Sequence, residues 1–405
     1  MIRYDKYKPS GVEWLGEIPE HWEVKRVKDF GEYQSGYFID ANEFDNNNDY
    51  PVFGGNGIRS YASKHNHNGE YILIGRQGAL CGNINIAKGK FWATEHAVVV
   101  YNKSNINKKW YAFLLEVMNL NQYAISAAQP GLSVDKVKRL MLPYISLPEQ
   151  IAIANYLDTK TVAIDQKIEL LTAKTAKYNA LRRSLINETV CRGLNPNVPL
   201  KDSGIEWIGK IPAHWEVKRF KEIARTVKGK NLDLSDTYFD KSLPNLSLDF
   251  LRNDSITFDT FCYTTDKNQR VTTNDMIIIW DGAGVGEILK GKDGFLSSTI
   301  AKIVVDNKKY DKNFLYHLRF SIEYVLKMIP AGMGIPHLNP QVLNSFDCPC
   351  PPLIEQLEIA QYLDNQTSQI DTILSNISNQ IGKLTQLRKT LINDVVTGKI
   401  KVTED

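Results

Sequence analysis

The chain has 405 residues and a formal net charge of only +3, with 43% hydrophobic and 23% charged residues. This length suggests two to four domains, and the apolar content is sufficient for real hydrophobic cores. The small net charge excludes a uniformly basic surface, so any nucleic-acid-binding surface must be a local patch or be shared with a partner.

The cysteines and the N-terminus point to a reducing compartment. The cysteines are odd in number and form no CxxC pair, which argues against a disulfide framework and a zinc site. The N-terminal sequence has no apolar signal core, and no run approaches 18 apolar residues. We therefore expect a soluble, cytoplasmic protein without a membrane segment.

The first repeated feature in chain order is a block that we call the leading block. It reads SGVEWLGEIPEHWEVKRVKDF at residues 10–30 and recurs as SGIEWIGKIPAHWEVKRFKEI at residues 203–223. A repeat at this distance indicates domain duplication rather than a solenoid. His21 and His214 recur inside the blocks and are interpreted as packing or hydrogen-bonding residues. The EVK triplets lack the preceding Pro-Asp of a nuclease site and are interpreted as strands.

Each leading block is followed by a region that is not repeated, about 31–146 and 224–352. We expect mixed α/β structure in both regions. β-Branched runs bounded by Gly, Asn and Asp predict strands at 71–74, 97–101, 276–280 and 300–305. Helical spacing predicts helices at 110–118 and 313–328.

Two glycine-rich segments in these regions superficially resemble cofactor loops. They are GRQGALCG at 75–82 and DGAGVG at 281–286. A phosphate-binding loop must open a helix, and neither segment is followed by one, so both are predicted to be turns between strands. His65 and His67 lack a third metal ligand. Because no nucleophile–base pair is evident either, we predict no metal site and no active site in this chain.

A long helix is predicted at 147–190 and again near the C-terminus. Its positions at alternating steps of four and three form an apolar stripe of coiled-coil period, and both copies carry Thr and Arg at the same two interruptions. A helix of about 43 residues is roughly 65 Å long, too long for the core of one small domain. The stripe includes Leu157, Ile164, Ile168, Leu171, Leu363, Ile370, Leu374 and Ile377.

The doubled order of leading block, unrepeated region and long helix resembles the specificity (S) subunit of type I restriction–modification systems. The matching segments are SGxEWxGxIPxHWEVKR at 10–26 and 203–219, LPEQIAIANYLD at 147–158, LIEQLEIAQYLD at 353–364 and LRKTLINDVVTGKI at 387–400. The resemblance covers almost the whole chain. One departure is that the first helix ends in NETVCRGL where the second ends in NDVVTGKI.

The resemblance implies an α+β fold, with two α/β target recognition domains separated by two long antiparallel coiled-coil helices in an internal pseudo-two-fold repeat. On this basis we expect Ile164, Ile168 and Leu171 to face Ile370, Leu374 and Ile377. The expected division is 1–146 for the first recognition domain with its leading block, 147–192 for the first spacer helix, 193–202 for a linker, 203–352 for the second recognition domain and 353–400 for the second spacer helix.

The resemblance also implies partners. Each recognition domain would read one half of a split target in double-stranded DNA, and the helices would set the spacing and dock modification subunits, two in number. Restriction/translocase subunits, also two, would join the complex. S-adenosylmethionine, ATP and Mg would belong to these partners, with no cofactor and no catalysis in this chain. The small net charge further predicts that the chain alone binds DNA weakly.

Candidate DNA contacts come from loops of the unrepeated regions, since base reading pairs Arg with guanine and Asn or Gln with adenine. They are Asn56, Arg59, Tyr61, Arg76 and Gln77 in the first region, and Lys228, Lys230, Asn231, His337 and Asn339 in the second. Basic residues of the leading blocks are candidate phosphate contacts; they are Lys25, Arg26, Lys28, Lys218, Arg219 and Lys221.

Two rival interpretations remain open. In the first, the chain is a self-contained restriction or adenine-methylating enzyme that carries its own recognition repeats. In the second, it is a coiled-coil assembly protein without a DNA role. The sequence does not give the bases recognised, because these depend on loop geometry and DNA shape.

Overall fold

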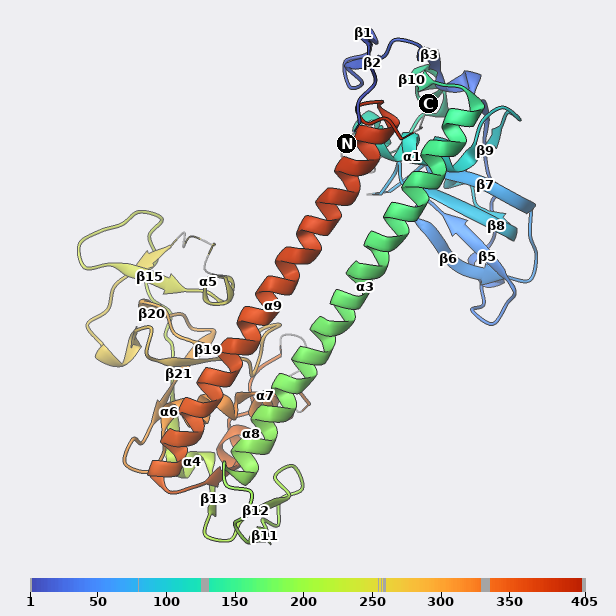
Figure 1. Ribbon diagram of the computed structural model, residues 1–405. Helices are drawn as coiled ribbons and strands as arrows, with labels where there is room; N and C mark the ends of the chain where they lie inside the picture. Colours follow the sequence, from blue (N-terminus) through green and yellow to red (C-terminus); the bar gives the residue numbers. More distant parts are fainter. Residues whose placement is uncertain are drawn as a thin grey trace. The chain divides into compact units, whose positions relative to one another are not determined.

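The structure, a computed structural model, describes residues 2–78, 80–124, 131–253, 255, 257, 260–328 and 336–402. The chain divides into two compact units, one of Met1–Ala173 with Ile377–Asp405 and one of Lys174–Asn376. The division runs through two long helices, α3 (Leu147–Arg192) and α9 (Leu353–Val396), so each unit contains a part of each helix (Figure 1). The fold mixes α and β structure, as the sequence predicts.

The first unit is built on a six-stranded sheet with the order β4-β9-β7-β8-β5-β6. Its side chains alternate between two faces, since Ile72 and Ile74 pack toward helix α1 while Leu73 packs on the other face with Phe91. The strands are β4 (Gly31–Ser35), β5 (Tyr50–Gly54), β6 (Gly57–Ala62), β7 (His67–Gly75), β8 (Ile84–Ala93) and β9 (Ala97–Asn102). The predicted strands 71–74 and 97–101 lie in β7 and β9.

The remaining elements of this unit surround the sheet. The helices are α1 (Lys108–Val117) and α2 (Val134–Arg139), with 3-10 turns at Val27–Asp29, Ala41–Glu43 and Leu120–Tyr123. Two small antiparallel pairs join β1 (Tyr7–Pro9) to β2 (Glu17–Pro19) and β3 (Glu23–Arg26) to β10 (Met141–Tyr144). The leading block therefore forms strands, as predicted for its EVK triplet.

The second unit has two four-stranded sheets, ordered β14-β21-β18-β19 and β16-β15-β20-β17. The first contains β14 (Ala224–Lys228), β18 (Met276–Ile279), β19 (Ile288–Lys290) and β21 (Ile300–Val305). The second contains β15 (Leu243–Leu246), β16 (Phe261–Cys262), β17 (Arg270–Val271) and β20 (Gly294–Leu296). β11 (Leu200–Asp202) pairs with β12 (Lys210–Pro212), and β13 (Glu216–Arg219) pairs with β22 (Asp347–Cys350).

The helices of the second unit correct one prediction. They are α4 (Phe220–Ile223), α5 (Leu248–Arg252), α6 (Lys312–His317), α7 (Arg319–Met328) and α8 (Pro340–Ser345), with a 3-10 turn at Lys267–Gln269. The single helix predicted at 313–328 is thus two helices with an interruption at Leu318. Neither Gly nor Pro marks this interruption, so hydrophobic spacing alone did not signal it. The segments 75–82 and 281–286 connect antiparallel strands, which confirms them as turns.

The same pair of side chains anchors the start of each long helix. In the first unit the Glu149 carboxylate accepts hydrogen bonds from Trp22 (3.0 Å) and Tyr4 (2.7 Å), while Gln150 accepts from the backbone N–H of Asn107 (2.8 Å). His21 lies 3.2 Å from the same carboxylate. Side chains of the leading block therefore bind directly to the start of the long helix in this unit.

The second unit repeats these contacts. Glu355 accepts from Trp215 (2.9 Å) and pairs with His214 (2.7 Å), and Gln356 accepts from the N–H of Asp311 (2.7 Å). The interpretation of both leading-block histidines as hydrogen-bonding residues is confirmed.

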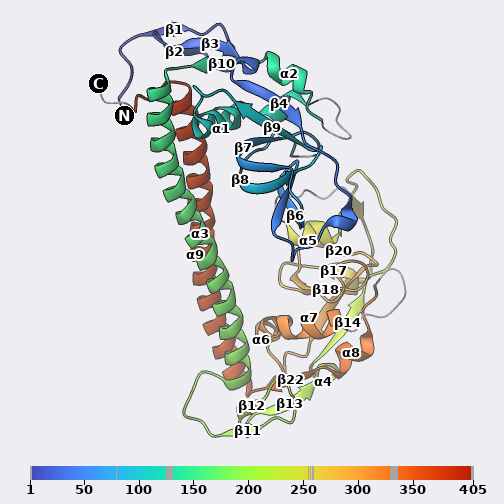
Figure 2. The ribbon, with the colours of Figure 1, turned by 90° about the vertical axis from the view of Figure 1, so that its right-hand side faces the viewer.

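The two long helices lie side by side within each unit (Figure 2). In the first unit Arg388 of α9 lies 3.1 Å from Asp165 of α3, and in the second Arg182 of α3 lies 3.1 Å from Asp371 of α9. The predicted stripe is the less exposed side of each helix: Leu157, Leu363, Ile370 and Ile377 are buried, and Ile164, Ile168, Leu171 and Leu374 are half-buried.

The register of this pairing differs from the predicted one. Because Arg388 is paired with Asp165, Ile164 lies beside the C-terminal part of α9 and packs against the cluster that contains Leu391 and Ile392. The expectation that Ile164, Ile168 and Leu171 face Ile370, Leu374 and Ile377 is therefore corrected. It matched equivalent positions of the repeat, whereas antiparallel helices oppose the start of one with the end of the other.

Candidate nucleic-acid interface

Three predicted base-reading residues of the first unit meet around one open hollow. Asn56, Arg59 and Gln77 line it together with His96, and its volume is about 520 Å³. The side chains come from the β5–β6 hairpin and from the loop after β7, while His96 precedes β9. A backbone hydrogen bond of 2.8 Å from the Arg76 N–H to the His96 carbonyl holds two of these loops together.

Glycine allows these loops to approach one another closely. A Cβ atom on Gly75 would lie 2.0 Å from the Gly55 carbonyl oxygen, and one on Gly55 would lie 2.7 Å from the Gln77 carbonyl oxygen. A side chain at Gly55 or Gly75 would push the loops apart, so backbone packing requires glycine at these two positions. Gly55 and Gly75 therefore help to position the loops that form the hollow.

Arg59 owes its direction to a bulge in the hairpin. Val52 is paired with Ser60 and Phe53 with Ile58, which leaves Arg59 as the extra residue of β6. An extra residue of this kind redirects its side chain. The Arg59 guanidinium lies 5.3 Å from the centre of the Phe44 ring and is exposed.

The other two predicted residues of this unit do not line the hollow. Arg76 is half-buried and donates from Nη1 to the Ser35 hydroxyl at 3.2 Å. Tyr61 is half-buried on β6. Asn56 accepts a hydrogen bond from the side chain of Asn83, which the sequence did not single out.

In the second unit, two of the predicted residues contact the side chain of Asp281. Lys228 Nζ lies 3.0 Å from Oδ2 of Asp281, and His337 Nδ1 lies 2.7 Å from Oδ1 of the same carboxylate. Partial burial of Asp281 would raise its pKa, but the hydrogen bonds from His337 and Lys228 outweigh this and hold the pKa below its usual value. Lys228 also lies 5.6 Å from the centre of the Trp280 ring. The sequence pattern around Asp281 predicts only a turn.

The remaining candidates of the second unit are engaged elsewhere. Lys230 forms an ion pair of 2.8 Å with Asp266, and Asn231 is exposed. The Asn339 side chain caps α8 by accepting from the N–H of Gln341 at 3.0 Å. This cap uses the amide oxygen that a bidentate contact to adenine would need, which weighs against Asn339 as a base reader.

The two clusters occupy corresponding places in their units. An isolated antiparallel β-bridge of the backbone joins Gln77 to Gly131 in the first unit, and a corresponding one joins Asp281 to His337 in the second. The next pair of backbone hydrogen bonds also corresponds, from Leu132 to Arg76 and from Leu338 to Trp280, both of 2.8 Å. The same backbone scaffold therefore presents different side chains in the two units.

Four of the six basic residues of the leading blocks lie on β3 and β13, which pair with the strands that precede the long helices. Lys25 pairs with Glu23 at 3.0 Å and lies 3.4 Å from the centre of the Tyr144 ring, and Lys218 pairs with Glu216 at 3.2 Å. These lysines stand on β3 and β13, and their local partners limit their availability as phosphate contacts.

The two neighbouring histidines are accounted for by packing. His67 is stacked on Phe91 at 5.2 Å and bonded to the Tyr101 hydroxyl at 2.9 Å, and burial lowers its pKa. His65 packs against Tyr50. Throughout the described part of the chain, no group of three or more His, Cys, Asp or Glu side chains is placed to hold a metal ion, and no helix there is long and apolar enough to cross a membrane.

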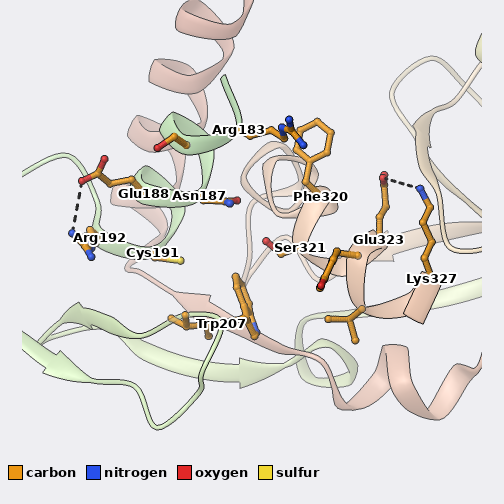
Figure 3. A pocket seen from close by; sticks show the side chains of 14 residues that line it. Arg183, Asn187, Glu188, Cys191, Arg192, Trp207, Phe320, Ser321, Glu323 and Lys327 are labelled. Carbon is orange, nitrogen blue, oxygen red and sulfur yellow. Dashed lines mark ion pairs between the residues drawn. The ribbon is translucent and has the colours of Figure 1, made fainter. Parts of the chain in front are cut away.

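A second, larger hollow of about 790 Å³ lies in the second unit between α3, α7 and the leading block (Figure 3). Trp207 and Phe320 line it beside charged groups of both signs. Its most buried acid is Glu323, which accepts from the Ile288 N–H at 2.9 Å and lies 4.0 Å from Lys327; burial raises the pKa of Glu323. None of the predicted DNA contacts line this hollow.

Comparison with known proteins identifies the family. The model described as type I restriction modification DNA specificity domain matches residues 19–177 and 212–383. The specificity subunit of the type I restriction enzyme EcoprrI of Escherichia coli is 57% identical over 109 residues, which cover 27% of each chain. The specificity subunit of the type I restriction enzyme MjaVIII of Methanocaldococcus jannaschii is 34% identical over 189 residues, 46% of this chain and 43% of that one.

These two matches span less than half of either relative. A longer match is the putative type I specificity subunit S.HindORF215P of Haemophilus influenzae, 25% identical over 342 residues, which cover 81% of this chain and 82% of that one. A solved structure on complex assembly and conformational transition of the type I R-M system has a TM-score of 0.69 at 16% identity, covering 95% of this chain and 99% of that chain. At this identity the structural likeness concerns the fold alone.

Proposed function

The chain belongs to the type I restriction–modification DNA specificity family, and on this premise we propose that each of its two units reads one half of a bipartite double-stranded DNA target. The observation that carries the proposal is the pair of corresponding loop clusters. Both arise from the unrepeated regions, and both are held by the same backbone contacts but carry different side chains.

The chemistry of the clusters supports two different half-sites. Around the first hollow, Arg59 offers a donor fork suited to guanine, while Asn56 and Gln77 offer amides suited to adenine. In the second cluster Lys228 and His337 can donate to base edges, and the Asp281 carboxylate can accept from a cytosine amine. The two units are therefore expected to prefer different bases.

We assign the long helices the role of spacer and docking surface for two modification subunits, with two restriction/translocase subunits joining the complex. Helices of 46 and 44 residues are roughly 65–70 Å long, which compares with about 34–36 Å per turn of DNA. Apolar side chains also stand on their outer sides: Leu170 is 71% exposed and Ile354 is 73% exposed.

In this proposal the partners supply the chemistry. S-adenosylmethionine would be bound by the modification subunits, and ATP and Mg by the restriction subunits. Incubation of the purified chain with duplex DNA and labelled S-adenosylmethionine, or with Mg, tests the rival enzyme interpretation. Robust methylation or cleavage by the chain alone would overturn the proposed division of labour.

Domain exchange tests the reading of half-sites. Replacing residues 31–146 by the corresponding region of another specificity subunit, in cells that carry the modification subunit, should change only one half of the methylated sequence. Mapping methylated adenines in the host genome reports both halves and their spacing. A change in both halves would contradict the modular interpretation. An assembly protein without a DNA role would instead show no sequence-selective retention of duplex DNA, even with the modification subunit present.

A single-residue test separates base reading from general attraction to DNA. Arg59→Ala should relax one position of one half-site, by about 1–3 kcal/mol of discrimination. Arg59→Lys is the matched control, because it keeps the charge but loses the bidentate fork. If Arg59 reads a base, both variants relax that position, whereas the salt dependence of DNA binding changes only in Arg59→Ala.

A further inference from the structure

The arginine that interrupts the apolar stripe has different surroundings in the two units. In the first unit Arg388 is held between two carboxylates, with Nη1 2.7 Å from Glu116 and Nε 3.1 Å from Asp165. These two acids engage both sides of the guanidinium. Glu116 comes from α1 and Asp165 from α3, so the arginine ties the sheet domain to the helix pair.

The equivalent Arg182 of the second unit has one carboxylate partner among the described residues. Its Nη1 lies 3.1 Å from Asp371, but its Nε is buried without a hydrogen-bond partner there. The missing acid is explained by sequence. Glu116 is the ninth residue after the helix cap Asn107, and the ninth residue after the corresponding cap Asp311 is Phe320.

A cation stands beside the position of the missing acid. Arg319 immediately precedes Phe320, and its guanidinium carbon lies 3.9 Å from the centre of the Tyr316 ring and 4.1 Å from that of Phe320. Its Nη1 donates to the Tyr316 carbonyl at 2.8 Å. These contacts fix the guanidinium in place. Burial lowers the pKa of Arg319, and the nearby charge of Arg182 lowers it further.

These two arginines line a pocket of about 690 Å³ that lies wholly within the second unit. Lys290 is a third cation on its wall, and its amine lies 5.4 Å from the centre of the Tyr316 ring. Ser368 and Ser375 of α9 also line the pocket. Cations and hydroxyls together are suited to an oxygen-rich anion.

A buried histidine adds a further unsatisfied group to the same wall. His317 is 4% exposed, and its Nε2 lies 2.9 Å from Asp364. Its Nδ1 is buried and has no hydrogen-bond partner in the described part of the chain. Because the Nε2–H of His317 donates to the Asp364 carboxylate, Nδ1 of the neutral ring is an acceptor and does not itself bind an anion. The unpartnered donor of this pocket is the buried Nε of Arg182, and buried donors normally find a partner.

We propose that this pocket binds an oxyanion, a carboxylate or a phosphate group, which takes the place that Glu116 occupies in the first unit. Three lysine and arginine side chains line the pocket against two aspartates, so one negative group balances the charge. A planar guanidinium binds either kind of anion by donating two parallel hydrogen bonds. The site is separate from both loop clusters and does not depend on the proposed DNA reading.

Thermal unfolding of the full chain at constant ionic strength tests the proposal. Sodium phosphate and sodium glutarate are titrated separately against sodium chloride. A saturable rise in Tm above that in chloride is expected, and the more effective anion identifies the source of the negative group. Arg319→Gln should weaken the affinity for the anion, read from the concentration dependence of Tm, about tenfold or more, because it removes a charged hydrogen-bond donor.

Two further variants complete the experiment. Lys327→Gln removes the same charge from the same helix but lies outside the pocket, so it should keep the full response. Lys290→Gln should weaken the response and, because Lys290 is exposed, it serves if Arg319→Gln does not fold. No rise beyond chloride in the original chain would overturn the proposal. So would a rise that both pocket variants retain.

Discussion

The indole N–H of Trp22 donates a hydrogen bond of 3.0 Å to the carboxylate of Glu149, and this contact joins the leading block to the first long helix. Its repeat between Trp215 and Glu355 does the same in the second unit. Since these contacts lie away from the loop clusters, the loops can vary while the frame that carries them stays constant.

The Glu149 contact leads to a stability prediction. Glu149→Leu leaves the buried Trp22 indole and the Tyr4 hydroxyl without an acceptor, so it should lower the free energy of unfolding by about 2–5 kcal/mol. Glu149→Gln keeps an acceptor oxygen and should cost less. Glu355→Leu should also cost less, because the Glu355 side chain is 35% exposed and that of Glu149 only 9%. Urea unfolding of the three variants measures the order, and equal losses at Glu149 and Glu355 would contradict it.

A glycine substitution should separate the two half-sites. In Gly75→Ala the new methyl group would meet the Gly55 carbonyl oxygen at 2.0 Å, so the hairpin that carries Asn56 and Arg59 must move. We expect recognition of the first half-site to weaken while the second is unchanged, as measured by methylation of targets with one altered half. Gly131→Ala is the control, because among the described residues the nearest atom to its new methyl group, the Arg76 carbonyl oxygen, lies at 3.9 Å. Equal effects of both variants would argue against close loop packing as the cause.

Local sequence patterns predict much of the fold but only part of the candidate sites. The long helices and the glycine-rich turns were predicted because their signals are local. Asp281 was not recognised as a site residue, since its partners Lys228 and His337 are more than 50 residues away on either side. The helix register was predicted wrongly because repeated positions look alike in sequence, whereas the Arg388–Asp165 and Arg182–Asp371 contacts show which positions meet.

His317 should make the second unit sensitive to mild acid. Burial lowers the pKa of His317, more than Asp364 raises it, so folding favours the neutral ring. The unfolded chain therefore binds the proton first, and stability should fall as pH drops below about 6.5, with a slope of up to about 1.4 kcal/mol per pH unit. His317→Phe places there the residue type found at Phe113, the corresponding position of the first unit.

Urea unfolding between pH 5 and 8 measures this effect. The His317→Phe chain should show a shallower fall toward low pH, by up to one bound proton. His67, whose pKa burial also lowers, remains in both proteins and contributes equally. An identical pH profile for the two proteins would show that His317 does not titrate between these limits.

The helix pair should depend on its apolar stripe more than on its ion pairs. Ile377→Ala removes a side chain that is 4% exposed and should cost about 2–5 kcal/mol. Leu170→Ala is the matched control, because Leu170 is 71% exposed and should change stability by less than about 0.5 kcal/mol. Asp371→Asn, which weakens a partly exposed ion pair with Arg182, should cost about 1 kcal/mol or less. Denaturant midpoints rank the three, and a dominant effect of Asp371→Asn would contradict this balance.

Lengthening both long helices tests whether they set the spacing of the half-sites. One heptad is inserted in α3 between Asp165 and Arg182, and one in α9 between Asp371 and Arg388, so that both interhelical ion pairs are kept. Seven residues add about 10 Å and nearly two whole turns, so the stripe stays in register. Because 10 Å corresponds to roughly three base pairs, the preferred gap in the methylated target should lengthen by about that amount. Insertion into α3 alone shifts one stripe along the other and should destabilise the pair instead. If the modification subunits together with the doubly lengthened chain still methylate targets with the original gap, the helices do not determine the spacing.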